Sequence, residues 1–116
     1  MAQLMQEPTF AILTSLAAGA RHGYAIIADV AESSDGAIRL QPGTLYSALD
    51  RLTGEGRVEV VAEEIVSGRL RRSYALTTDG VAVLAAEAER RAASARRALA
   101  RVHALPVAGR VTPAVS

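Results

Sequence analysis

The sequence lacks cysteine, tryptophan and lysine, and three tyrosines and one phenylalanine are its only aromatic residues. Without cysteine it can form no disulfide, thiol nucleophile or cysteine-ligated zinc site. It has no run of about 18 apolar residues, so a membrane-spanning helix is not expected. Its N-terminal stretch MAQLMQEPTF has neither the basic nor the apolar region of a secretory signal. We therefore expect a cytoplasmic protein.

The shortage of aromatic residues limits the hydrophobic core. The chain has 116 residues, enough for one domain but not for two. Hydrophobic residues make up 50% of it, but many of these are alanines, which bury little surface. We therefore expect a small aliphatic core, with further burial supplied by a second copy of the chain.

The charge is unevenly distributed although the net charge is only +1. Residues 1–68 hold four arginines against nine acidic residues, a net charge of −5. Residues 69–116 hold nine arginines against three acidic residues, a net charge of +6. Such asymmetry is typical of chains that bind a polyanion. The use of arginine in place of lysine is weaker evidence, because GC-rich codon usage produces it too.

The spacing of apolar residues predicts three helices in the first half of the chain. The first covers residues 6–18, with Pro8 in its first turn and Gly19 just beyond its end. The second follows Gly23, ends near residues 33–36, and has an inner face formed by Tyr24, Ile27, Ala28 and Ala31. After an extended connector over residues 37–41, the third begins at Pro42 and has an inner stripe of Leu45, Leu49 and Leu52.

The pattern then changes from helical to alternating. Runs from Val58 and from Leu70, separated by a Ser67-Gly68 turn, predict a two-stranded hairpin standing alone. An isolated hairpin is only marginally stable, so we expect Leu70 and Tyr74 to pack on the helices. A last helix is predicted from an N-cap at Thr77 to about residue 103.

Three helices, a hairpin and a long helix indicate a mainly α fold of winged helix-turn-helix type. We expect this DNA-binding domain over residues 1–78, a dimerisation helix over 79–104 and a disordered tail over 105–116. Three sequence blocks, in this order and with these gaps, resemble the PadR family of winged-helix transcriptional regulators: His22-Gly23-Tyr24, Gly43-Thr44-Leu45-Tyr46-x-Ala48-Leu49-x-Arg51-Leu52 and Arg71-Arg72-x-Tyr74-x-Leu76-Thr77-x-x-Gly80.

The resemblance covers about residues 5–100, and the single long helix after the hairpin is similar to the short C-terminal subgroup of the family. It implies a homodimer that binds a pseudo-palindromic operator in double-stranded DNA and acts as a repressor. In some members a small-molecule effector releases the DNA, and the sequence does not identify one. The competing hypothesis is a winged-helix module that binds protein, because the first half of the chain is acidic.

The third predicted helix carries the first group of candidate DNA contacts. Small and hydroxyl residues at a helix N-terminus suit an approach to phosphates and base edges in the major groove. Tyr46 contacts DNA or is a half-buried core residue, and Arg51 contacts phosphate or forms an internal ion pair. The candidates on this helix are Gln41, Gly43, Thr44, Tyr46, Ser47 and Arg51.

The hairpin carries the second group. Its alternation places Arg69 and Arg71 on one face, where they can reach phosphates or a narrow minor groove. The alternative is that they pair across the strands with Glu63 and Glu64. Arg72, on the other face, is expected to cover the base of the hairpin.

The last helix has an apolar seam with three- and four-residue steps, which predicts a dimer interface. Glu87 and Arg91 add an ion pair on its outer side. The alternative is a helix that lies across the first helix of the same chain. The candidate interface consists of Phe10 and Leu13 from the first helix with Val81, Leu84, Ala88, Ala92, Ala95, Leu99 and Val102.

Neither histidine is expected to act in catalysis or to bind a metal. His22 stands at a helix start, and His103 stands near a helix end, where a cation suits the dipole. No nucleophile and base have a spacing that indicates catalysis. We therefore expect no enzyme activity, no metal site and no cofactor.

Overall fold

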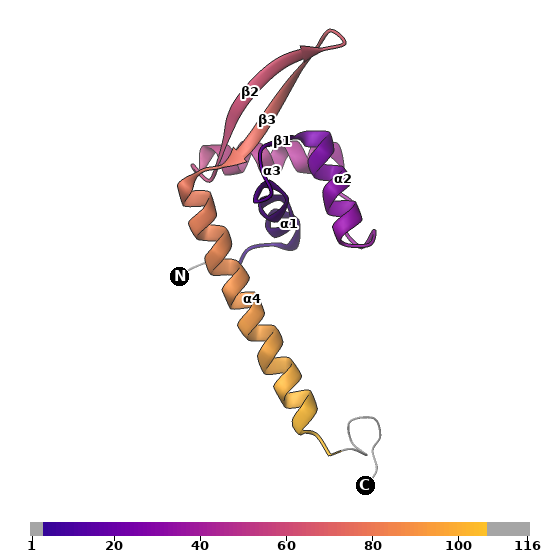
Figure 1. Cartoon of the computed structure of the whole chain (residues 1–116), viewed down its shortest axis with the longest axis vertical. Coiled ribbons are helices and arrows are strands. Elements are labelled where there is room, and N and C mark those ends of the chain that lie inside the picture. The colour runs from indigo at the N-terminus through magenta and orange to yellow at the C-terminus, as the bar shows by residue number, and fades with distance from the viewer. Residues whose placement is uncertain (1–3, 107–116) are drawn as a thin grey trace. The chain divides into compact units, whose positions relative to one another are not determined.

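The computed structural model describes residues 4–106. Its helices and strands confirm the predicted winged-helix fold class, and Figure 1 labels them. In chain order they are α1 (Glu7–Leu16), β1 (Arg21–His22), α2 (Gly23–Ser33), α3 (Pro42–Gly54), β2 (Val58–Val66), β3 (Arg69–Leu76) and α4 (Thr78–Ala104).

The chain divides into two compact units, Met1–Ala85 and Ala86–Ser116. The first unit contains the winged helix and the first turns of α4. Residues 107–116 of the predicted tail lie outside the described part of the chain.

Local signals in the sequence explain where the helices begin. The ring Nδ1 of His22 accepts a hydrogen bond from the Ala25 amide at 3.3 Å, so His22, predicted to stand at a helix start, is the N-cap of α2. The Thr77 hydroxyl accepts one from the Gly80 amide at 3.0 Å, which confirms Thr77 as the N-cap of α4. Proline opens both α1 and α3, where its missing N–H leaves no bond unmade.

Gly80 allows the start of α4 to lie close to the chain before β2. A Cβ at this position would collide with the backbone carbonyl oxygen of Arg57. The same oxygen accepts a hydrogen bond from the Thr77 amide at 3.1 Å. The glycine of the third sequence block is therefore required by packing.

The core is aliphatic, as expected, and Tyr74 is the only aromatic residue among the buried hydrophobic residues of the described chain. The predicted inner stripe of α3 is confirmed, because all three of its leucines are 0% exposed. The core consists of Ile12, Leu13, Leu16, Ile26, Val30, Leu40, Leu45, Leu49, Leu52, Val58 and Tyr74.

The predicted inner face of α2 is confirmed at Ile27, which packs against the core, and is wrong at Tyr24 and Ala28. Tyr24 is 66% exposed, and Ala28 is exposed as well. The buried residues of α2 are instead Gly23, Ile26 and Val30. Ile26 and Val30 lie one turn apart on the same side of α2, and burying them removes their apolar surface from water.

The hairpin does not stand alone, which corrects the prediction. The short strand β1 pairs antiparallel with β3, and the strand order is β1-β3-β2. Arg21 of β1 also donates to the buried Ser15 hydroxyl and pairs with Asp29, both at 3.4 Å. A strand of two residues is too short to show an alternating pattern, so the sequence could not reveal it.

The β2–β3 hairpin extends away from α1, α2 and α3 (Figure 1). Its turn residues Ser67 and Gly68 have φ values of 53° and 79°, the left-handed conformation of a tight two-residue turn. Tyr74 is 5% exposed and packs in the core as predicted, but Leu70 is 53% exposed. The prediction for Leu70 is wrong because it lies four residues nearer the tip, beyond the helices that cover Tyr74.

Candidate nucleic-acid interface

The N-terminal half of α3 presents a polar surface opposite its buried leucines. Gln41, Gly43, Thr44 and Ser47 are all exposed. No side chain caps this helix end. The amides of its first turn have no carbonyl partner within the helix, and together with the helix dipole they favour an anion. This surface can therefore hydrogen-bond to phosphate through backbone and to base edges through hydroxyl groups.

Tyr46 is half-buried, and part of its side chain stays open to solvent. Its side chain is 38% exposed, and its ring lies against the backbone of Gly23. A Cβ at position 23 would come within 2.7 Å of the ring carbon Cζ of Tyr46. Burial, with smaller effects of Tyr74 and Tyr24, raises the pKa of Tyr46. This packing links the first two sequence blocks, because the glycine of one block makes room for the tyrosine of the other.

Tyr24 is a candidate that the sequence analysis missed. It was placed on the inner face of α2, yet it is exposed and close enough to Tyr46 to affect the pKa of that phenol. Its position directly after Gly23 was the available signal, because the contact between Gly23 and Tyr46 holds the first turn of α2 beside α3.

Arg51 is engaged within the chain, which is the second of its two alternatives. Its Nη2 donates to the Thr9 hydroxyl at 2.8 Å, and its Nη1 lies 3.5 Å from the Glu55 carboxylate. Thr9 belongs to α1, so the guanidinium connects two helices. Its position near the end of α3 directs it away from the polar N-terminal surface.

The arginines of the hairpin differ in their partners. Nε and Nη2 of Arg71 donate to Oε1 of Glu64 across the strands, as in the alternative hypothesis. Arg72 pairs with Glu63 at 2.7 Å rather than covering the base of the hairpin, and this hydrogen bond raises the pKa of Arg72. Arg69 forms no ion pair with any residue between 4 and 106.

These cross-strand pairs leave the hairpin able to bind a polyanion. The side chains of Arg71 and Glu64 are 41% and 55% exposed. Exposed ion pairs contribute about 0–1 kcal/mol, so a phosphate can replace a carboxylate at little cost. The hairpin therefore offers one unpaired guanidinium at Arg69 and two that can exchange partners.

The sequence of residues 12–86, more than half of the chain, matches the Transcriptional regulator PadR-like family. The chain belongs to this family. Curated proteins provide no further guide, because none of them matches the sequence.

Solved structures share the fold of this PadR-like chain. A PadR family transcription regulator from Clostridium difficile is 29% identical, with a TM-score of 0.60 over 71% of this chain and 83% of that one. Bacillus subtilis PadR in complex with operator DNA is 26% identical, with a TM-score of 0.61 over 68% of this chain and 45% of that one. A regulator from Clostridium thermocellum, 24% identical, has a TM-score of 0.67 over 76% of this chain and 85% of that one.

The apolar residues of α4 in this PadR-like chain are largely exposed. Val81, Leu99 and Val102 are 54%, 56% and 48% exposed, and Ala88, Ala92 and Ala95 are exposed too. Leu84 is partly buried against the core of the first unit.

The two interface candidates on α1 differ in exposure. Phe10 is half-buried, whereas Leu13 is 0% exposed. The assignment of Leu13 to a dimer interface is wrong, because its side chain is already buried in its own core.

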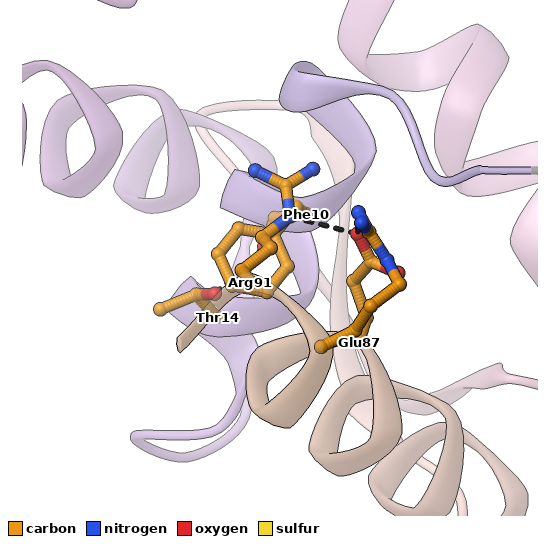
Figure 2. Close-up of polar contacts among 5 residues, drawn as sticks. Phe10, Thr14, Glu87 and Arg91 are labelled. Carbon is orange, nitrogen blue, oxygen red and sulfur yellow. Dashed lines mark hydrogen bonds and ion pairs between the residues drawn. The ribbon is translucent and has the colours of Figure 1, made fainter. Parts of the chain in front are cut away.

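An ion-pair cluster marks the middle of α4. The predicted contact between Glu87 and Arg91 is confirmed at 2.8 Å, and Figure 2 shows it as a dashed line. Its predicted place on the outer side of the helix is wrong, because Glu87 is only 9% exposed. Arg90 also donates to Glu87, at 2.6 Å. Hydrogen bonds from these two guanidinium groups lower the pKa of Glu87 to about 2.

The described residues supply no group of three or more histidine, cysteine, aspartate or glutamate side chains arranged to hold a metal ion. None of the described helices is long and apolar enough to cross a membrane.

Proposed function

We propose that this PadR-like chain is a sequence-specific DNA-binding repressor that acts as a homodimer on a pseudo-palindromic operator. The observation that carries this proposal is the two-sided character of α3. Its leucines are fully buried, while Gly43, Thr44 and Ser47 are exposed at its N-terminal end. A helix held rigidly by its core side and polar on its free side is what major-groove readout requires.

The proposed contacts divide between α3 and the hairpin. Thr44 and Ser47 bind base edges or phosphate, Gly43 lets the backbone approach phosphate, and Gln41 precedes them at the same helix end. The hydroxyl of Tyr46 binds phosphate while its ring stays packed against Gly23. Arg69 and Arg71 bind the phosphate backbone beside the groove. Arg51 is left out of the proposal, because its guanidinium is held by Thr9 and Glu55.

The dimer rests on the apolar seam of α4. Three of its large residues are about half exposed, and contact with a partner helix would remove their apolar surface from water. The alanines between them let a partner helix approach closely. A two-fold dimer would present two copies of α3 to half-sites about one turn of DNA apart.

A gel-shift experiment with DNA from upstream of the chain's own gene tests the proposal. If each protomer neutralises about 3–4 phosphates, the dimer neutralises about 6–8, and the slope of log K against log salt is about −5 to −7. Binding should therefore weaken steeply with salt and be competed by an inverted repeat. The absence of a salt-sensitive shift with every upstream fragment would contradict it.

A protein-binding module remains the second candidate function. It is favoured by the net charge of −5 over residues 1–68 and by the carboxylates that pair with Arg71 and Arg72. Release of the DNA by a small-molecule effector is part of the repressor proposal, and only the family resemblance supports it. Catalysis belongs to neither candidate.

A further inference from the structure

The tip of the hairpin carries two large apolar side chains that the core does not use. Ile65 and Leu70 are cross-strand partners next to the Ser67-Gly68 turn. Their side chains are 69% and 53% exposed, and neither belongs to the core or packs against it. Single exposed apolar residues are ordinary, but a facing pair at a projecting tip indicates a contact surface.

The charges around this pair favour an anionic partner. Glu63 and Glu64, the acidic residues nearest to it, each pair with an arginine of β3. Arg69, at the turn, has no acidic partner within the described chain. The tip therefore combines an apolar pair with a free guanidinium, and its carboxylates are neutralised.

A second copy of the chain fits this surface poorly. β2 forms one edge of the sheet, and its exposed residues include Glu59, Glu63 and Glu64. A break in register between Val60 and Ala62 further disrupts the edge. Charges and bulges of this kind prevent edge strands from pairing with one another.

The minor groove of DNA matches both features of the tip. Its negative potential attracts arginine, and isoleucine or leucine side chains can insert between base steps and kink the duplex. The turn residues Ser67 and Gly68 have small side chains, and a hairpin that enters tip first brings in the pair Val66 and Arg69 and then the pair Ile65 and Leu70. Its two faces then meet the two walls of the groove.

We infer that Ile65 and Leu70 form an apolar wedge that enters the minor groove beside the operator and partly unstacks a base step, while Arg69 binds the adjacent phosphate. This inference rests on the proposed function. The inference goes beyond the proposed function in one respect: the hairpin deforms the DNA. The sequence at the flanks of the operator is then selected by how easily it kinks.

The double variant Ile65→Thr/Leu70→Thr tests the wedge in the full-length chain. Threonine is a β-branched residue that strands favour, and it replaces apolar surface with a hydroxyl at both positions. Val61→Thr is the matched control, because Val61 is 49% exposed on the same strand and lies nearer the base of the hairpin. The probe is a duplex cut to the footprint on the upstream DNA, with 2-aminopurine placed at each step in turn and dyes at its ends.

Binding of the wild-type chain should shorten the distance between the two ends of the duplex. It should also raise 2-aminopurine fluorescence at one base step in each half-site. The double variant should lose both effects and bind about tenfold more weakly, which is about 1.4 kcal/mol. Its salt slope should stay unchanged, because no charge is altered. Val61→Thr should behave as the wild type.

Unchanged bending and fluorescence with the double variant would overturn the inference while the proposed function stands. A wild-type chain that binds the duplex without raising fluorescence at any step would overturn it too, whether or not the variant folds. Loss of dimers in sedimentation of the variant would assign the pair to a contact between copies instead. Failure of the wild-type chain to bind any upstream fragment would reject the proposed function itself.

Discussion

Replacing Glu64 with glutamine should strengthen DNA binding by releasing Arg71. In the structure the guanidinium of Arg71 donates two hydrogen bonds to one oxygen of Glu64. Both side chains are about half exposed, so losing the pair costs the fold less than about 1 kcal/mol. The charge that the carboxylate neutralises then becomes available to phosphate.

The size of the effect follows from counterion release. In the wild-type complex the Glu64 carboxylate offsets the charge of Arg71 beside the phosphate, so its removal adds one unit of positive charge per protomer and two per dimer, which steepens the slope of log K against log salt by about 1.8. Over a fourfold change in salt, from about 50 to 200 mM, the affinity of Glu64→Gln should fall about tenfold further than that of the wild type. Arg71→Ala should do the opposite and flatten the slope by about one unit per protomer.

Fluorescence anisotropy with one labelled duplex, titrated at several salt concentrations, measures these slopes. The double variant Arg71→Ala/Glu64→Gln is the internal control, because its net charge equals that of the wild type and its slope should return to the wild-type value. Four identical slopes would refute the placement of the hairpin against phosphate. A flat response to Glu64→Gln alone would show that Glu64 does not restrain Arg71.

Further predictions concern α3, the start of α4 and its middle. Thr44→Ala should reduce discrimination between operator and mutated operator by about 1–3 kcal/mol if Thr44 reads a base, whereas an equal loss on all sequences would make it a phosphate contact. Gly80→Ala should destabilise the fold by about 1–3 kcal/mol in urea unfolding, while Gly54→Ala, where a Cβ meets nothing within 4 Å, should not. Leu99→Glu should produce monomers in sedimentation, and an unchanged dimer would place the seam elsewhere. Because the pKa of Glu87 is lowered from 4.5 to about 2, Glu87→Gln should destabilise the fold above pH 4.5 but lose this effect as the pH falls to about 2; an equal difference at both pH values would contradict the ion pair.

Features specified by neighbouring residues could be predicted from the sequence. The bounds of α3 follow from Pro42 and from glycine after its leucine stripe, and the hairpin turn follows from Ser67-Gly68. The caps at His22 and Thr77 are equally local, because each side chain bonds an amide three residues away. Such signals need no knowledge of the rest of the chain.

The choice between alternative partners could not be predicted in this way. Arg51 contacts Thr9 across 42 positions of sequence. Two hypotheses were open for Arg71, an ion pair with an acidic residue across the hairpin and a contact with DNA phosphate. The alternating sequence pattern is compatible with either of them. Only the register of β2 against β3, which places Glu64 opposite Arg71, decides between them in the free protein.

By itself the sequence determined the order and type of the main elements, the buried stripe of α3 and the family blocks that carry the functional prediction. Tertiary structure alone decided that β1 joins the sheet, that α2 turns Ile26 inward and exposes Tyr24, that Leu13 is a core residue and that Leu70 lies free at the tip. The physical reason is the distance along the sequence over which each kind of interaction acts. Periodicity, caps and turns act over a few residues, whereas burial depends on which distant segments cover a side chain, and each face is chosen by the apolar area that it removes from water.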